Sequence, residues 1–199
     1  MNKIGPRWEW RAFGSQFPDE EAQIRQYDIT STRESTELYI ISIHSNDNTK
    51  IRDELMDIKT PLRISQDGLE KWTVVMKAGF PIHINELALV YKAWGIPIPY
   101  LDKDEYSYQE YLNKLIIENT DLRTVEVNKT RHGYLINEVI VEIADVSFNS
   151  TPLRTIAVEH ADPDKVIDII NRLGLRKYEN TNYIKAIKRL LNIPYDMRS

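Results

Sequence analysis

Charged residues alternate with apolar ones in several strand-like stretches of the chain. In KIRDELMDIK, residues 50–59, Lys50 and Arg52 flank Ile51, and Asp57 and Lys59 flank Ile58. Because successive side chains of a strand point to opposite faces, such a stretch has one charged face and one apolar face. Two architectures accommodate it. One is a sandwich with its charges in water, and the other is a barrel with a wet interior and helices over its apolar outer face.

The remaining pattern predicts seven or eight strands with helices in the middle and at the end of the chain. The predicted strands cover residues 7–13, 37–44, 50–52, 56–64, 71–77, 122–134, 138–147 and 153–160. Helices are predicted after an Asp19 cap, over 84–94 and 106–118, after Asp162-Pro163, and after an Asn180 cap. The fold class is therefore α+β, and alternating charges in both halves favour a barrel over a two-layer sheet.

Composition limits the function classes. A chain of 199 residues with 42% hydrophobic content predicts one domain, 1–199. The absence of cysteine excludes disulfides, thiolate metal sites and a cysteine nucleophile. No apolar run suits a membrane span or, in residues 1–11, a signal peptide, so we expect a cytoplasmic protein without a membrane partner. A net charge of −4 gives no support for nucleic-acid binding, and nothing indicates the oligomeric state.

Two pairs of cations are spaced to share a strand face. Lys50 and Arg52 form one i, i+2 pair, and Lys129 and Arg131 form the other. Arginine offers a fork of donors to phosphate oxygens, and lysine offers a compact charge. Two such pairs on different strands could converge on a polyanion. The alternative is that each pair decorates a solvated sheet face, as Lys and Arg commonly do.

Carboxylates in the predicted strands are candidate ligands for a divalent cation. Glu9 and Glu142 lie in predicted strands, and Glu159 ends the otherwise apolar stretch TIAVE. Mg²⁺ prefers such carboxylate oxygens as ligands. The alternative is that a glutamate at a strand end pairs with a nearby arginine. No HExxH, GxSxG, P-loop or GxGxxG motif is present, so zinc protease, hydrolase-elbow and common nucleotide-binding loops have no support.

The order of these features resembles the CYTH superfamily of triphosphate tunnel metalloenzymes, and bacterial CYTH-like proteins in particular. The resemblance runs from about Trp8 to Leu191. It is carried by KIRDELMDIK, GLEKW, Phe80-Pro81, VNKTRHGY, TIAVEHADPDKVIDIINRLGL and NTNYIKAIKRLL. It implies an eight-stranded antiparallel β-barrel, a triphosphate tunnel, with flanking and C-terminal helices.

The resemblance also implies roles for individual residues. The ligand would be a small polyphosphate or a nucleotide, and water would attack its terminal phosphorus. Metal ligands for Mg²⁺ or Mn²⁺ would be Glu9, Glu142 and Glu159. The phosphate-binding residues would be Lys50, Arg52, Lys59, Lys129 and Arg131.

One departure from the family pattern is clear on the first strand. The family motif ExExK reads here Glu9-Trp10-Arg11-Ala12-Phe13, so that Arg11 replaces an acid and Phe13 replaces the lysine. Ala157 likewise stands where an ExE pair would have its first acid. Fewer acids bind Mg²⁺ less well, whereas Arg11 is expected to attract phosphate.

Two functional hypotheses follow. The first is metal-dependent hydrolysis of inorganic triphosphate, a nucleoside triphosphate or short polyphosphate. The second is binding of a phosphorylated or other anionic ligand without turnover, which the loss of ExExK favours. A structural domain without activity is the third alternative. Adenylate cyclase activity also occurs in the superfamily, and no residue here selects for it.

Overall fold

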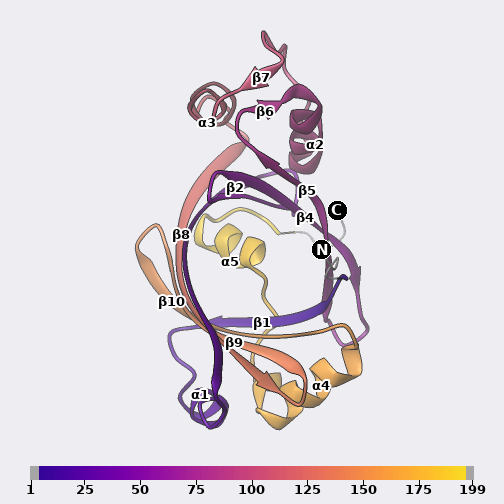
Figure 1. Ribbon diagram of the computed structural model, residues 1–199, viewed down its shortest axis with the longest axis vertical. Helices are drawn as coiled ribbons and strands as arrows, with labels where there is room; N and C mark the ends of the chain where they lie inside the picture. The colour runs from indigo at the N-terminus through magenta and orange to yellow at the C-terminus, as the bar shows by residue number, and fades with distance from the viewer. Residues whose placement is uncertain (1–4, 196–199) are drawn as a thin grey trace. The chain divides into compact units, whose positions relative to one another are not determined.

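The computed structural model describes residues 5–195. Eight strands close into an antiparallel barrel in the hydrogen-bonded order β1-β10-β9-β8-β2-β3-β4-β5 (Figure 1). This confirms the α+β barrel with flanking and C-terminal helices. The strands are β1 (Trp8–Gly14), β2 (Ile29–Ser42), β3 (Asn48–Arg52), β4 (Leu55–Ile64), β5 (Glu70–Gly79), β8 (Leu122–Ile136), β9 (Val139–Phe148) and β10 (Thr151–His160), with a separate short pair β6 (Ile82–His83) and β7 (Glu105–Tyr106). The helices are α1 (Pro18–Ile24), α2 (Ile84–Trp94), α3 (Tyr108–Glu110), η1 (Tyr111–Ile116), α4 (Pro163–Arg172), η2 (Leu175–Lys177) and α5 (Tyr183–Leu190).

The chain divides into two compact units. Unit 1 comprises the residues up to Ser35, Pro61–Thr73 and Val127–Asn182. Unit 2 comprises Thr36–Thr60, Val74–Glu126 and the residues from Tyr183 onward. The long strands β2, β4, β5 and β8 contain residues of both units. The single domain over 1–199 stays a prediction, and its ends, 1–4 and 196–199, lie outside the described residues.

The core of unit 1 forms where one face of the sheet β1, β10, β9 and β8 meets α4. Alternate strand residues such as Trp10, Val141 and Ile156 are buried there with Val166 and Ile169 of α4. Removing such a side chain from water stabilises the fold by roughly 1.5–3 kcal/mol. The alternation leaves the charged residues on the opposite face of the same strands. We call this opposite face, turned away from α4, the inner face of unit 1.

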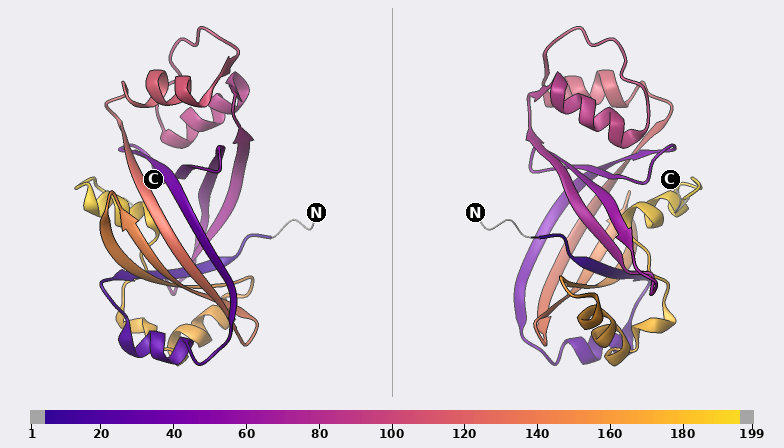
Figure 2. Two further views of the ribbon diagram at one scale, coloured as in Figure 1. Left: turned by 60° about the vertical axis from the view of Figure 1, so that its left-hand side comes forward. Right: turned by 90° about the vertical axis from the view of Figure 1, so that its right-hand side faces the viewer.

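Unit 2 is built in the same way around α2. Ile40, Ile51 and Ile58 of β2, β3 and β4 pack with Leu87 and Trp94 of α2. α2 spans the predicted residues 84–94: it begins at a His83 capping box and ends at Gly95 in the left-handed region. Helices α2 and α3 lie side by side in both views of Figure 2, within one hydrophobic cluster. We call the strand face turned away from α2 the inner face of unit 2.

Two-residue turns close three of the hairpins. Asp53-Glu54, Asn137-Glu138 and Asn149-Ser150 each have positive φ at both positions. Such turns match the twist of antiparallel strands and fix the pairing register. Glu138, which the sequence pattern places in a strand, is therefore a turn residue, because asparagine and its neighbour adopt the left-handed region here.

Two predicted helix caps are wrong. The residue before α1 is Phe17, which is fully buried, and Asp19 lies in the first turn of the helix instead of capping it. Asn180 precedes α5 by three residues, and its side chain makes tertiary contacts. Its Oδ1 accepts from the Arg11 N–H at 2.9 Å, and its Nδ2 donates to the Gly68 carbonyl at 2.6 Å. At Asn180, tertiary partners thus replace the local capping interaction.

The helix predicted over 106–118 is shorter and irregular. Tyr106 belongs to β7, Ser107 caps α3, and the chain continues as the π-helical segment η1. The wider turn buries Tyr111, Leu115 and Ile116, a packing requirement that helical periodicity does not reveal. Within residues 5–195, no helix combines the length and the apolar content that crossing a bilayer requires.

An ion-pair network between α1 and β10 makes the stability of unit 1 sensitive to acid. Arg154 donates two hydrogen bonds of 2.6 Å to Glu21 and also contacts Asp145. These bonds lower the pKa of Glu21 below its ordinary value of 4.5. A carboxyl group with a lowered pKa stabilises the fold above its unfolded pKa, and this contribution is lost as the pH falls through the folded pKa.

We therefore expect Glu21→Gln to lower the free energy of unfolding by about 1–2 kcal/mol at pH 7. The difference from wild type should shrink below pH 4.5, which urea titrations from pH 3 to 7 would measure. Glu138→Gln is the matched control, because the Glu138–Lys165 pair is exposed. A difference between wild type and Glu21→Gln that does not change with pH would contradict the assignment.

Candidate functional site

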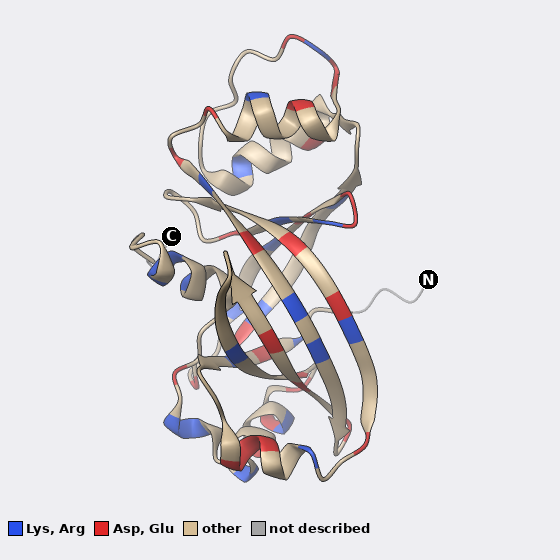
Figure 3. Cartoon of the chain, turned by 90° about the vertical axis from the view of Figure 1, so that its left-hand side faces the viewer, with Lys and Arg blue, Asp and Glu red and all other residues tan. Residues whose placement is uncertain are grey.

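Strand register gathers six of the predicted site residues on the inner face of unit 1. Residues directly opposite one another in an antiparallel sheet share a face. Arg11 faces Ala157, Ala157 faces Glu142, and Glu9 faces Glu159. On β8, Arg131 faces Ala144 and Lys129 faces Val146, which lie on the same face of β9 as Glu142. Charged positions recur along the strands in Figure 3. The six residues on this inner face are Glu9, Arg11, Lys129, Arg131, Glu142 and Glu159.

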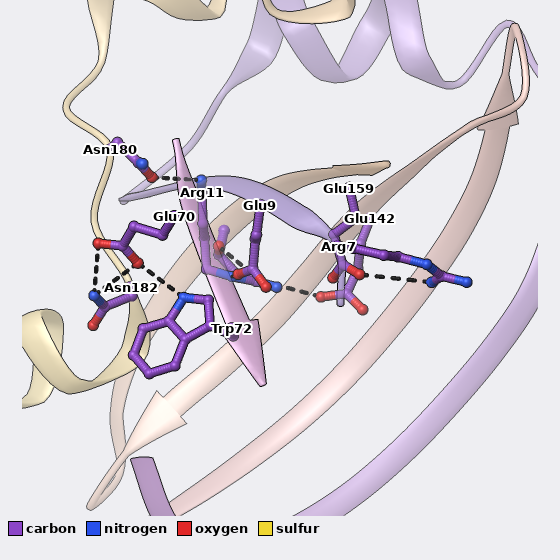
Figure 4. Close-up of polar contacts among 10 residues, drawn as sticks. Arg7, Glu9, Arg11, Glu70, Trp72, Glu142, Glu159, Asn180 and Asn182 are labelled. Carbon is purple, nitrogen blue, oxygen red and sulfur yellow. Dashed lines mark hydrogen bonds and ion pairs between the residues drawn. The ribbon is translucent and has the colours of Figure 1, made fainter. Parts of the chain in front are cut away.

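Arg11 lies at the centre of the acidic part of this face (Figure 4). Its Nε donates to Glu9 Oε1 at 2.9 Å, and its Nη1 donates to Glu142 Oε1 at 3.2 Å. Nη1 also lies 3.4 Å from the Thr155 hydroxyl. Only 6% of the Arg11 side chain is exposed, against 26% for Glu9 and 22% for Glu142. The guanidinium is thus a buried bridge between two carboxylates that are partly open to solvent.

The neighbouring carboxylates have their own donors. Glu9 lies in register with Glu159 on one side and with Glu70 on the other. An Arg7 Nη1 lies 3.8 Å from Glu159 Oε2. Glu70, which is buried, accepts from Asn182 Nδ2 at 2.9 Å and from Trp72 Nε1 at 3.1 Å (Figure 4). Like charges directly opposite one another repel, and these separate donors offset the repulsion along the row.

The predicted divalent metal does not fit this arrangement. Mg²⁺ needs oxygen ligands around it at 2.0–2.1 Å, with near-octahedral geometry. Here the Arg11 guanidinium occupies the space between Glu9 and Glu142, and Arg7 faces Glu159. Across residues 5–195, no group of three or more His, Cys, Asp or Glu side chains is arranged to hold a metal ion. The metal role of Glu9, Glu142 and Glu159 stays a prediction from resemblance.

On the inner face of unit 2, a glutamate lies against the predicted phosphate binders. Lys50 Nζ donates to Glu37 Oε2 at 2.9 Å, and Arg52 Nη1 donates to Glu37 Oε1 at 3.3 Å. Glu37 is fully buried. Burial lowers the pKa of Lys50, and the Glu37 carboxylate opposes that shift. Any phosphate approaching Lys50 or Arg52 therefore has to compete with a carboxylate already in place.

The same inner face holds Asp57 and Lys59. Asp57 faces Lys50 in the β3–β4 hairpin, and Lys59 faces Asn48. Asp57 is buried, and its Oδ1 has no hydrogen-bond partner in the described part of the chain. The repulsion of Lys59 adds to the lowering of the Lys50 pKa. Register thus confirms the shared face of the cations in KIRDELMDIK, but their surroundings are acidic as well as basic.

Helix α5 lies on the inner face of unit 2. Tyr183 stacks on Tyr39, the neighbour of Lys50 in register, with ring centroids 5.8 Å apart. At the other end of α5, Lys188 is buried and donates at 2.8 Å to the Ser45 carbonyl and to Asn46 Oδ1. Sequence periodicity predicts this helix and its apolar stripe, but not the face it covers.

Sequence reasoning missed several residues of both faces. Glu37 begins a predicted strand and carries no motif, although its i+2 spacing from Tyr39 already places both on one face. Thr155 and Asn182 contact Arg11 and Glu70 across more than 100 positions of sequence. Only the tertiary fold brings these residues together, so local spacing contains no signal for them.

No family model matches the chain, and no curated protein matches it in sequence. Solved structures share its fold. A candidate adenylyl cyclase from Hippeastrum, described as having a dominant triphosphatase activity, has a TM-score of 0.53 at 9% identity, over 96% of this chain and 99% of that one. The PH1819 protein from Pyrococcus horikoshii OT3 scores 0.50 at 10% identity, over 92% and 99%. A candidate adenylate cyclase, bh2851 from Bacillus halodurans, scores 0.50 at 13% identity, over 89% and 95%. The likeness shows that the chain shares the fold of these proteins, in agreement with the barrel that the sequence resemblance predicts.

Proposed function

We propose that this protein binds a small polyphosphate or another phosphorylated anion on the inner face of unit 1, without turning it over. The observation that supports the proposal is the register, which puts Lys129, Arg131 and Arg11 on one face of one sheet. Lys129 and Arg131 lie two residues apart on β8 and can engage neighbouring phosphate oxygens. Lys50, Arg52 and Lys59 are proposed for the same role on the inner face of unit 2, where Glu37 competes with the ligand.

Hydrolysis of a triphosphate is the second candidate. It is favoured by the shared fold with the Hippeastrum protein, whose reported activity is mainly that of a triphosphatase. The ion pairs of Arg11 argue against hydrolysis. Arg11 bridges Glu9 and Glu142, so two of the three carboxylates predicted to bind a metal already have a cationic partner. Both candidates require the same cations to bind the phosphate groups. They differ in whether the bound ligand is then hydrolysed.

One experiment separates them. Calorimetric titration with tripolyphosphate measures binding, and release of inorganic phosphate from the same compound measures turnover, with Mg²⁺, with Mn²⁺ and with neither. Binding without release in all three buffers is the expected result. Phosphate release that depends on the metal would favour the hydrolysis candidate over binding without turnover. If the protein neither binds tripolyphosphate nor releases phosphate from it, both candidates are rejected.

Arg131→Ala should weaken tripolyphosphate binding about tenfold, because a charge-assisted hydrogen bond to phosphate is lost. The free energy of unfolding should change little, since Arg131 Nη2 donates its 2.9 Å hydrogen bond to a neutral partner, the Ser35 hydroxyl. Arg172→Ala is the matched control, because Arg172 lies on α4, against the opposite face of the sheet. Equal affinities of the Arg131→Ala variant and wild type in calorimetry would remove Arg131 from the site.

A further inference from the structure

Acids and cations are segregated on the inner face of unit 1. Glu70, Glu9 and Glu159 form a row across β5, β1 and β10, while Lys129 and Arg131 lie on β8. Glu142 on β9 stands between the two groups: it faces Gly133 on β8, two residues from Arg131. Diagonal neighbours across adjacent strands are roughly 7–8 Å apart, which is close enough for a carboxylate to repel an anion held by Arg131. The boundary between the groups therefore needs a positive charge.

Arg11 supplies that charge. It reaches from β1 to Glu142 on β9, over the strand β10 that separates them. The residue of β10 lying between them in register is Ala157, whose single methyl group leaves room for the long side chain to pass. Thr155, the next inner-face residue of β10, lies within reach of the same Nη1. The two departures from the family pattern, Arg11 and Ala157, are thus neighbours in one arrangement.

We propose that the Arg11 guanidinium is a resident cation that takes the place of a divalent metal, so that this protein binds its polyphosphate ligand uncomplexed by Mg²⁺ or Mn²⁺. An arginine carries a permanent charge and presents a planar fork of donors that matches two carboxylates. Fixed between Glu9 and Glu142, it offsets one of their two negative charges before any ligand arrives. Arg11 is a positioning and charge-balancing residue at the floor of the face, and Lys129 and Arg131 make the phosphate contacts. The inference rests on the proposed function.

The first test compares tripolyphosphate binding in EDTA and in Mg²⁺ by calorimetry. Wild type should bind at least as tightly in EDTA. Arg11→Met exposes two unneutralised carboxylates, so its affinity in EDTA should fall at least about tenfold, and added Mg²⁺ should restore part of it. Arg172→Met is the matched control and should behave as wild type in both buffers. Wild-type binding that requires Mg²⁺, or an Arg11→Met variant as tight as wild type in EDTA, would overturn the inference.

The second test measures Mn²⁺ binding by electron paramagnetic resonance, without a phosphate ligand. Wild type should show no saturable site. Arg11→Glu removes the resident cation and adds a carboxylate beside Glu9 and Glu142, so it should gain a stoichiometric Mn²⁺ site. Saturable Mn²⁺ binding by wild type, or none by a folded Arg11→Glu variant, would overturn the inference.

The two tests also distinguish failure of the inference from failure of the proposed function. If wild type binds no tripolyphosphate in either buffer, the proposed function fails, and the Mn²⁺ measurement still decides the role of Arg11. Circular dichroism establishes whether each variant is folded. If Arg11→Met and Arg11→Glu do not fold, the wild-type measurements decide alone: binding in EDTA and no Mn²⁺ site support the inference, and the opposite results overturn it.

Discussion

Glu37→Ala is expected to lower the free energy of unfolding by about 3–5 kcal/mol. Glu37 is fully buried and is the carboxylate between Lys50 and Arg52, whose side chains are 10% and 20% exposed. Removing one partner of a buried ion pair leaves the other charge desolvated and uncompensated, and here two charges are affected. Urea denaturation of the variant and of wild type at pH 7 measures the loss.

Glu34→Ala is the matched control, because Glu34 is an exposed glutamate on the same strand. We expect a change within about 0.5 kcal/mol there. A loss of less than about 1 kcal/mol for Glu37→Ala would mean that a second carboxylate balances the cations. Asp57, opposite Lys50 in register, is the neighbour to test, through the double variant Glu37→Ala/Asp57→Asn.

The same variant tests the predicted phosphate-binding role of Lys50 and Arg52. With Glu37 removed, a tripolyphosphate ion no longer competes with a protein carboxylate for these two cations. The ligand should therefore raise the melting temperature of Glu37→Ala by more than it raises that of wild type. An equal rise in both proteins would indicate that Lys50 and Arg52 are structural partners of Glu37 and take no part in ligand binding.

Trp94→Ala is expected to lower the free energy of unfolding by about 3–5 kcal/mol, the range for removing a large aromatic side chain from a core. Trp94 is 1% exposed, and its Nε1 donates to Thr49 Oγ1 at 2.9 Å. Thr49 in turn donates to the Ile40 carbonyl at 2.6 Å, so that α2, β3 and β2 are joined by one chain of bonds. Loss of the indole therefore loosens the strand that carries Lys50. Thermal and urea unfolding measure the effect.

Tyr100→Ala serves as the control for Trp94→Ala, because Tyr100 is an aromatic residue of unit 2 that is 93% exposed. Trp94→Phe keeps most of the volume and loses the N–H donor, and Thr49→Val removes the acceptor. In a double-mutant cycle, these two changes should show a coupling of about 1 kcal/mol. Additive effects would mean that the bond from Trp94 to Thr49 contributes nothing beyond packing.

The alternation of KIRDELMDIK predicts correctly which of its residues share a face, because side-chain direction in a strand depends only on position along it. The Asp53-Glu54 turn is equally local and equally predictable. What the cations contact is not local. The bond from Arg11 to Glu142 spans 131 positions, and it depends on the pairing of β1 with β10 and of β10 with β9. Spacing along the chain contains no information about such a pairing.

The predicted Asn180 cap is wrong for the same reason. Asn180 is a good capping residue by type and position, but the Arg11 N–H and the Gly68 carbonyl are available to it in the folded unit. The family resemblance predicts the barrel because a fold depends on many positions together. It does not fix the chemistry of the site, where single residues such as Arg11 and Ala157 depart from the family pattern.

The two-residue turns fix the pairing register of each hairpin, and the register decides which residues share a face. With the Asp53-Glu54 turn, every second residue of β3 and β4 belongs to one inner face, and substitutions change individual residues without changing the register. A shift of the pairing by one position would place isoleucines on the inner face instead of the cations. Point substitutions can therefore change the chemistry of such a face while the pairing of its strands stays the same, and the chain shares its fold with the PH1819 protein at 10% identity.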